Sequence, residues 1–257
     1  MLLAIDIGNT NIVAGVFEEN VLRASWRLAT DARKMPDEYV VLLRALFDAA
    51  EISPSNITGS IMCGVVPGAQ SMMRDGVQGL LGRAPLLVSS ALDLGIEVRY
   101  SPPHGVGADR IANAVAAVDG YGSPAIVVDF GTSTNFDVIS DDGAYVGGAI
   151  APGLEISEEA LFAHTAQLPR VPLEPPATAI GTNTVASLQS GILFGYAGLI
   201  DGLVGRIQRE LKARAMVIAT GGLARTVAPC TECVNHVDLD LTLTGLRILY
   251  SRNAGAT

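Results

Sequence analysis

Hydrophobic and polar positions alternate in blocks along the first half of the chain. Leu2–Ile7 is an apolar run broken by a single charge, which is typical of a buried strand. Pro36–Ala50 has apolar residues at helical spacing and acidic residues in its first turn. Ile57–Val66 again has the composition of a buried strand. Strands that alternate with helices predict an α/β fold.

The second half of the chain has the same kinds of pattern. Apolar strand-like runs cover Ala125–Ile139 and Met216–Thr220. Helical spacing predicts helices over Ile156–Ala166, Val185–Leu211 and Leu241–Tyr250. We therefore expect mixed sheets flanked by helices in both halves.

An internal repeat relates the two halves at an offset of 123 residues. The offset aligns Asp129 with Asp6 and Gly131 with Gly8, and it places the turn at 142–143 on the turn at 19–20. Two such halves suggest a gene duplication, with two similar lobes whose aspartate turns face each other across a cleft. The division is expected near Gly120–Ser123, which gives lobes of residues 1–120 and 121–257.

Composition and charge exclude several classes of protein. The chain has 257 residues, of which 49% are hydrophobic and 17% charged, which argues against disorder. A net charge of −9 argues against broad binding to nucleic acid or to an anionic membrane surface. A small anion accompanied by a metal ion remains a suitable ligand.

Two segments bear on localisation. The opening apolar run lacks a basic leader and is too short for a secretory signal, so we expect a cytoplasmic protein. Residues 185–206 are the most membrane-like stretch, but Asp201 would be costly in lipid, by about 2.5 kcal/mol or more. Glycines at four-residue spacing in this stretch instead favour close packing of two helices, and no membrane span is expected.

Three cysteines cannot all pair within one chain. Cys230 and Cys233 form a single CxxC with no second pair, and His236 follows three residues later. Incidental thiols are the favoured interpretation of this pair, and a metal site is the alternative.

Glycine turns follow two of the strand-like runs. Gly8–Asn11 begins two residues after Asp6, so its backbone N–H groups would bind phosphate while Asp6 faces the accompanying metal ion. Gly221 and Gly222 follow Met216–Thr220 and leave room for a flat base against the backbone. An ordinary tight turn and a turn that starts a helix are the respective alternatives.

With these turns, the sequence resembles a type III pantothenate kinase, a family of the acetate and sugar kinase, Hsp70 and actin superfamily. The superfamily motifs are matched by residues 6–11, 129–134 and 219–222. The family-specific motifs are matched by Tyr100 with residues 105–113, by residues 147–153 and by residues 181–184. The resemblance covers nearly the whole chain and implies an actin-like ATPase fold of two ribonuclease H-like lobes with the active site between them.

The resemblance also implies an activity and its site residues. The reaction is transfer of the γ-phosphoryl group of ATP to the primary hydroxyl of pantothenate, the first step towards coenzyme A, with Asp109 as the base. Mg²⁺ would lie near Asp6, a monovalent cation (K⁺ or NH₄⁺) would bind Asp129, and the enzyme would be a homodimer with the pantothenate pocket near the interface. The implied ATP contacts are Asp6, Ile7, Gly8, Asn9, Thr10, Asn11, Ile12, Val13, Thr132, Gly221 and Gly222. The implied pantothenate contacts are Tyr100, Gly107, Ala108, Asp109, Arg110 and Thr184.

Alternatives exist for several of these roles. Asp109 would instead cap a helix over Arg110–Val118, a role that is compatible with catalysis. Asp129 would be a buried turn carboxylate. Arg110 would form a surface or intersubunit salt bridge. Pro102 and Asn135 depart from the family pattern, where Asn and Thr are usual, which affects the expected substrate contacts more than the reaction.

Other classes of function share part of the pattern. A nucleotide switch of the actin or Hsp70 type would need a longer chain, and a ribonuclease H-like nuclease would need clustered carboxylates and a basic surface. An accessory binding protein that keeps the fold without turnover is the third alternative.

Overall fold

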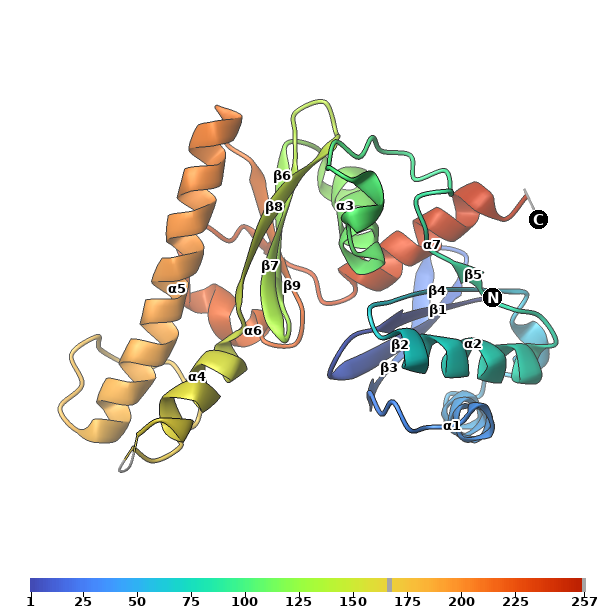
Figure 1. Ribbon diagram of the computed structural model, residues 1–257, viewed down its shortest axis with the longest axis horizontal. Helices are drawn as coiled ribbons and strands as arrows, with labels where there is room; N and C mark the ends of the chain where they lie inside the picture. Colours follow the sequence, from blue (N-terminus) through green and yellow to red (C-terminus); the bar gives the residue numbers. More distant parts are fainter. Residues whose placement is uncertain (166–167, 256–257) are drawn as a thin grey trace. The chain divides into compact units, whose positions relative to one another are not determined.

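The computed structural model describes residues 1–165 and 168–255 and divides the chain into two compact units (Figure 1). The first unit comprises Met1–Ala116 and Leu241–Thr257, and the second comprises Ala117–Asp240. Each unit contains a mixed five-stranded sheet with helices against it. The predicted α/β class is therefore confirmed.

The sheet of the first unit has the order β3-β2-β1-β4-β5. Its strands are β1 (Leu2–Ile7), β2 (Asn11–Glu18), β3 (Val21–Ala29), β4 (Gly59–Gly64) and β5 (Leu86–Leu87). The first three strands are antiparallel neighbours, whereas β4 runs parallel to β1 and β5 parallel to β4. The parallel pairing puts the carboxyl ends of β1 and β4 at the same edge.

Helices cover both faces of this sheet. α1 (Pro36–Ala49) and α2 (Pro67–Leu81) place Tyr39, Phe47 and Met73 in a core with the apolar side chains of β1 and β2. α7 (Leu241–Asn253) packs against β1, β2 and β4 on the opposite face, with Leu246 and Leu249 fully buried (Figure 1). α3 (Ala108–Tyr121) begins in this unit and continues into the second. Short 3-10 turns lie at Pro54–Asn56 (η1) and Pro103–Gly105 (η2).

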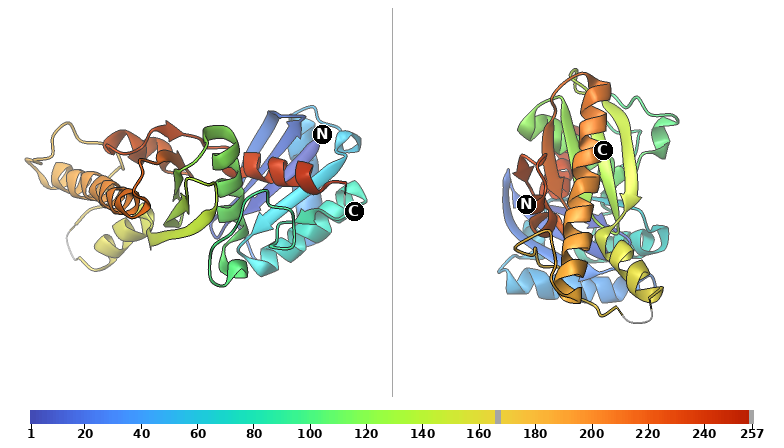
Figure 2. Two further views of the ribbon diagram at one scale, coloured as in Figure 1. Left: turned by 90° about the horizontal axis from the view of Figure 1, so that it is seen from above. Right: turned by 90° about the vertical axis from the view of Figure 1, so that its left-hand side faces the viewer.

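The sheet of the second unit has the order β10-β9-β6-β7-β8. Its strands are β6 (Ala125–Phe130), β7 (Ser133–Ile139), β8 (Tyr145–Pro152), β9 (Met216–Thr220) and β10 (His236–Val237). α4 is Leu154–Ala163, α5 is Thr184–Leu211, α6 is Ala224–Val227 and the 3-10 turn η3 is Ala228–Cys230. α5 lies across one face of the sheet, where Leu193, Ile200 and Val204 join the core (Figure 2).

The predicted repeat is confirmed by this topology. β1, β2, β3, β4 and β5 correspond in order and pairing to β6, β7, β8, β9 and β10. Asp6 and Asp129 are each the fifth residue of the central strand. Both predicted hairpin turns are present, at 19–20 and at 140–144.

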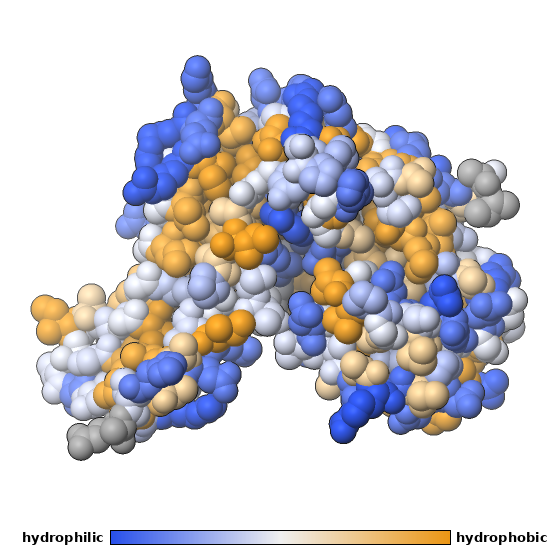
Figure 3. Space-filling view, in the orientation of Figure 1, coloured by the Kyte–Doolittle hydropathy of each residue, from blue (hydrophilic) through white to orange (hydrophobic). Residues whose placement is uncertain are grey.

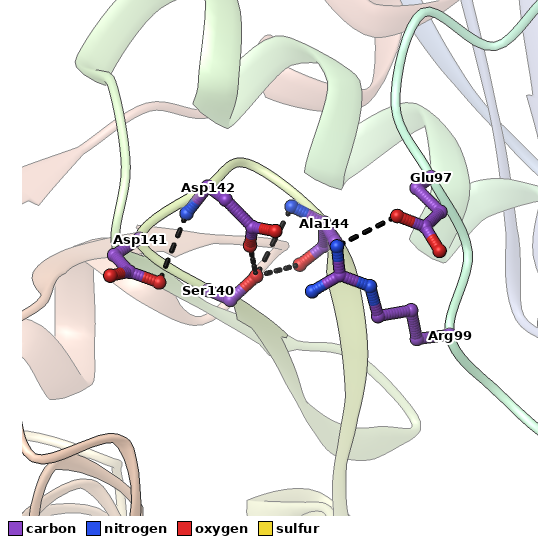
Figure 4. A network of polar contacts seen from close by, with 6 residues as sticks. All are labelled: Glu97, Arg99, Ser140, Asp141, Asp142 and Ala144. Atoms are coloured by element: carbon purple, nitrogen blue, oxygen red, sulfur yellow. Dashed lines mark hydrogen bonds and ion pairs between the residues drawn. The ribbon is translucent and has the colours of Figure 1, made fainter.

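The second hairpin turn is held by a serine. Ser140 Oγ donates to Asp142 Oδ1 at 2.5 Å and accepts from the Ala144 N–H at 3.2 Å (Figure 4). Figure 4 also shows the exposed ion pair of Arg99 with Glu97 in the first unit, at 2.7 Å. Exposed pairs of this kind contribute about 1 kcal/mol at most.

The domain division differs from the prediction in one segment. Residues 241–257 were expected in the second lobe, but α7 belongs to the first unit. The reason is packing: a Cβ atom on Gly59 would lie 1.9 Å from the Tyr250 hydroxyl, and one on Gly15 would lie 2.8 Å from Leu243. The chain therefore passes between units twice, within α3 and at 240–241.

Element bounds differ at several ends. The strand predicted over 57–66 is the shorter β4, because Pro54–Asn56 forms η1 before it and α2 begins at Pro67. α4 starts at Leu154, directly after Gly153, and the predicted end at Ala166 lies outside the described residues. The other predicted helices agree with α1, α5 and α7 within a few residues.

By length and composition alone, α5 is apolar enough to cross a membrane, and 28% of its most apolar window is buried. A helix of a protein core passes the same test, so this is weak evidence for a span. Asp201, in the middle of α5, accepts the backbone N–H groups of Glu232 and Cys233 at 3.0 Å each. These bonds attach the helix to the turn before β10.

Candidate active site

The first glycine turn lies at the end of β1 in the first unit. The Gly8 N–H donates to Asn11 O at 2.9 Å, and a Cβ on Gly8 would meet that same oxygen at 3.0 Å. Asn9 and Thr10 are exposed at the tip of the turn. The turn thus offers backbone to solvent at the edge where β1 and β4 end, as a phosphate-binding turn requires.

A carboxylate and a thiol lie side by side behind this turn. Asp6 and Cys63 are paired in the parallel register of β1 and β4, and Cys63 Sγ donates to Asp6 Oδ1 at 3.2 Å. Burial raises the pKa of the Cys63 thiol well above its usual range, and the charges of Asp6 and Asp109 raise it further. The thiol is therefore a neutral donor at physiological pH, and both carboxylates lie in its vicinity.

Asp109 occupies the first turn of α3. The helix begins at Ala108, and Ile111 N donates to Gly107 O at 3.1 Å, so Asp109 is inside the helix. The alternative that Asp109 caps a helix starting at Arg110 is thus wrong. Its Oδ1 is buried and has no hydrogen-bond partner among the described residues. Its carboxylate folds over Gly107, where a Cβ would lie 2.4 Å from Oδ1.

The second unit brings two glycine turns together. Asp129 and Thr220 are paired in the parallel register of β6 and β9, so the turns after both strands share one edge. Gly221 has a φ of 89°, which favours glycine, and a Cβ there would lie 2.4 Å from Asp129 Oδ1 and 2.7 Å from Phe130 O. Gly131 and Thr132 are exposed beyond Asp129. The structure therefore places Asp129, the predicted cation ligand, at the same sheet edge as Thr132 and Gly221, which are two of the predicted ATP contacts.

The described residues contain no group of three His, Cys, Asp or Glu side chains suited to hold a metal ion. Cys230 and Cys233 are free thiols, and the pKa of Cys233 is raised to about 12 by burial and by Asp201. The interpretation of this pair as incidental thiols stays a prediction.

Sequence comparisons with known proteins agree on one family. A family model described as type III pantothenate kinase matches residues 2–206. The type III pantothenate kinase of Thermomicrobium roseum is 52% identical over 252 residues, covering 98% of this chain and 97% of that protein. That of Moorella thermoacetica is 48% identical over 253 residues, covering 98% and 100%. The chain belongs to the type III pantothenate kinases.

Solved structures agree on the fold of this pantothenate kinase family member. Component A of (R)-2-hydroxyglutaryl-CoA dehydratase from Acidaminococcus fermentans superposes with a TM-score of 0.61 at 14% identity, covering 100% of this chain and 99% of that chain. The ethanolamine utilization protein EutJ of Carboxydothermus hydrogenoformans gives 0.55 at 14% identity, covering 96% and 89%. The fold is that of the actin-like ATPases, as expected.

The residues that the pantothenate kinase resemblance assigns to pantothenate lie in both units. Tyr100, partly exposed, lies against Gly105, where a Cβ would be 3.6 Å from its ring. Pro102 stands where the family usually has Asn. Its carbonyl oxygen accepts the Gly105 N–H at 2.9 Å, at the start of η2. Asn135, the other departure, is paired with Asp129 across β6 and β7 and accepts from Ser133 Oγ at 3.2 Å.

Thr184 belongs to the second unit, as the first residue of α5. Asn183 caps this helix by accepting the Ala186 N–H at 3.0 Å. Thr184 lines an open hollow of about 490 Å³ together with residues 181–183, Ser187, Leu188 and Leu168. Its part in pantothenate binding stays a prediction, since Tyr100 and residues 107–110 belong to the first unit.

Two contacts of this kinase were not predicted from the sequence. The hydrogen bond from Cys63 to Asp6 depends on the pairing of β4 with β1. In the sequence, it is indicated only by the similar positions of Cys63 and Asp6 near the ends of two apolar strands. Thr30 binds the first glycine turn from the end of β3, with Oγ1 donating to Gly8 O at 2.8 Å. In the sequence, this contact is indicated by the position of Thr30 directly after the third strand of the repeat.

Proposed function

We propose that the protein transfers the γ-phosphoryl group of ATP to the primary hydroxyl of pantothenate, forming 4′-phosphopantothenate in the first step of coenzyme A synthesis. The observation that carries the proposal is identity of about half the residues to type III pantothenate kinases over nearly the whole chain. The three free cysteines are typical of a reducing compartment, which supports placing the reaction in the cytoplasm.

Asp109 is the proposed base that orients the pantothenate hydroxyl and accepts its proton. Its buried Oδ1 can accept a hydrogen bond from the substrate hydroxyl, because no described residue donates to it. Phosphoryl transfer passes through a loose transition state, so the proton leaves late and placement matters more than a high pKa. The first turn of α3 supplies that placement on a rigid element.

The remaining machinery binds and orients the substrates. Backbone N–H groups of the turns at 8–11 and 131–134 would bind the ATP phosphates, and Gly221 and Gly222 would accept the adenosine. The carboxylate of Asp6 would hold Mg²⁺, which, when bound, offsets negative charge on the phosphates. Tyr100, residues 107–110 and Thr184 would bind pantothenate.

A single assay tests the activity against the alternatives. Protein mixed with Mg-ATP, K⁺ and pantothenate should produce ADP and 4′-phosphopantothenate in equal amounts. ADP without phosphopantothenate would favour a nucleotide switch, and no turnover would favour an accessory binding protein. Either result would contradict the proposed kinase.

Asp129 makes the rate dependent on a monovalent cation. Its Oδ1 and the Phe130 carbonyl oxygen both border Gly221, and oxygen ligands of this kind suit K⁺. We expect a several-fold higher rate in potassium buffer than in sodium buffer of matched ionic strength. Asp129→Asn should reduce this preference by weakening the cation site, and equal wild-type rates in the two buffers would contradict the assignment.

A homodimer formed through α5 is the proposed assembly. Gly191, Gly195, Gly198 and Gly202 lie on one face of the helix, and a Cβ on any of them would meet no described atom within 4 Å. A groove of about 400 Å³ between α4 and α5 lies beside them and is mainly apolar in its lining. Figure 3 shows hydrophobic surface along the middle of α5. Such a face suits close packing against a second helix.

Light scattering tests this assembly. The wild type should have twice the chain mass of 26.7 kDa, and Gly195→Leu should shift it towards the monomer by blocking close helix approach. Gly120→Leu, at an exposed site of α3 that also has open space, is the matched control and should stay dimeric. A fully active monomeric wild type would contradict the proposal.

A further inference from the structure

Thr30 holds the first glycine turn at two points. It directly follows β3, and its backbone N–H donates to Thr10 O at 2.9 Å while its Oγ1 donates to Gly8 O at 2.8 Å. The bond from the Gly8 N–H to Asn11 O, at 2.9 Å, also closes the turn. The end of β3 thus fixes two carbonyl groups of the turn, on either side of Asn9.

Gly153 has the corresponding place in the second unit. It directly follows β8 and stands 123 residues after Thr30, the offset of the internal repeat. A Cβ on Gly153 would lie 2.2 Å from Thr132 O and 2.7 Å from Gly131 O. Both neighbours are backbone atoms of the second glycine turn, so only glycine fits here without moving that turn.

The carbonyl groups matter because of peptide geometry. A peptide unit is planar and trans, so its N–H points opposite to its C=O. Fixing the Gly8 carbonyl therefore aims the Asn9 N–H, and fixing the Thr10 carbonyl aims the Asn11 N–H. In the second turn, the Gly131 and Thr132 carbonyls set the direction of the Thr132 and Ser133 N–H groups in the same way.

We propose that Thr30 and Gly153 are positioning residues that aim the phosphate-binding N–H groups of the two glycine turns, one by hydrogen bonds and the other by direct backbone packing. The proposal rests on the proposed function, in which both turns bind ATP phosphates. The two units then use one topological position, the residue after the third strand, for the same purpose with different chemistry. Neither residue touches the reacting atoms, so each acts on nucleotide binding rather than on pantothenate.

Two variants of Thr30 separate the hydroxyl from the shape of the side chain. Thr30→Val keeps the β-branched shape and the backbone N–H but loses the bond to Gly8 O, whereas Thr30→Ser keeps the hydroxyl. We expect Thr30→Val to raise the Kd for a non-hydrolysable ATP analogue, measured by calorimetry, by roughly threefold to tenfold, the range for losing one hydrogen bond. The KM for ATP should rise in parallel, while the KM for pantothenate and the melting temperature stay near wild type. Thr30→Ser should bind the analogue as the wild type does.

Gly153→Ala tests the second turn. We expect it to weaken analogue binding by on the order of tenfold or more, because the added carbon displaces two carbonyls. Gly120→Ala, placed in open space, is the matched control and should bind normally. If this variant fails to fold, the Thr30 pair still decides the proposal.

The outcomes distinguish the inference from the function on which it rests. A wild type that does not bind the analogue overturns the proposed ATP site itself. A wild type that binds, with Thr30→Val binding equally well, overturns the positioning role alone. A rise in Kd for both Thr30→Val and Thr30→Ser would also overturn it, since the hydroxyl would not be the group responsible.

Discussion

Asp109→Asn is expected to lower kcat for pantothenate phosphorylation by roughly 10²-fold to 10⁴-fold, the range for losing a positioned acid or base. The amide keeps the shape of the side chain but does not accept a proton from the attacking hydroxyl. Because Oδ1 has no donor among the described residues, the substitution breaks no hydrogen bond at that atom. The melting temperature should therefore change little, and steady-state kinetics with thermal unfolding checks both expectations.

Two further variants make this result specific. Asp119→Asn removes a carboxylate from an exposed site on the same helix and should leave kcat unchanged. Asp109→Ala should be as inactive as Asp109→Asn. Both variants should lose a similar, modest amount of stability, because each removes from the first turn a negative charge that favours the helix by about 0.3–1 kcal/mol. An Asn variant with near-normal kcat would remove Asp109 from the mechanism.

The local features of this fold could be predicted from the sequence because they depend on neighbours in the chain. Asp6 and Asp129 stand at the ends of apolar runs that only a buried strand accommodates, and the turns that follow are marked by glycine. The repeat then related the two halves, and the strand orders confirm it. Residue spacing alone does not assign roles such as the base Asp109, and those assignments come from the resemblance to the family.

The remaining features depend on contacts between distant segments. Nothing in the sequence around Leu241–Asn253 indicates that this helix returns to the first unit, because its apolar face would suit either sheet. Cys63 is one of three similar cysteines until β4 is paired with β1. Asp109 was predicted one residue before its helix because capping and first-turn positions favour the same acidic residues.

Gly245 is a point where α7 packs closely against α3, and its substitution tests how the first unit holds Asp109 in place. A Cβ on Gly245 would lie 1.9 Å from Ala112 O, 2.5 Å from its carbonyl carbon and 2.9 Å from its Cα. Ala112 is three residues after Asp109 on α3, and next to it Thr242 Oγ1 donates to Asn113 Oδ1 at 2.7 Å. These neighbours are helix backbone, so no flexible side chain can move aside.

Two effects of opposite sign compete in Gly245→Ala. Helix propensity favours Ala over Gly by about 1 kcal/mol, whereas forcing extra volume into a packed core costs about 1–3 kcal/mol and occasionally more. The contact at Gly245 is far shorter than any real carbon contact, so packing decides the sign. We expect the free energy of unfolding of the first unit to fall by about 1–3 kcal/mol.

Trp26 makes the change in Gly245→Ala measurable in the first unit alone. It is the single tryptophan of the chain and lies on β3, with its ring 5.8 Å from that of Phe47. Denaturant unfolding followed by Trp26 fluorescence should show a lower midpoint for Gly245→Ala, and kcat should fall because α3 moves with Asp109. Gly68→Ala, in α2 where a Cβ meets nothing within 4 Å, should leave the midpoint unchanged or raise it. Unfolding of Gly245→Ala at the wild-type midpoint would contradict this expectation. It would mean that α7 shifts to accommodate the added carbon without loss of stability, so that the close packing of α7 on α3 does not stabilise the first unit.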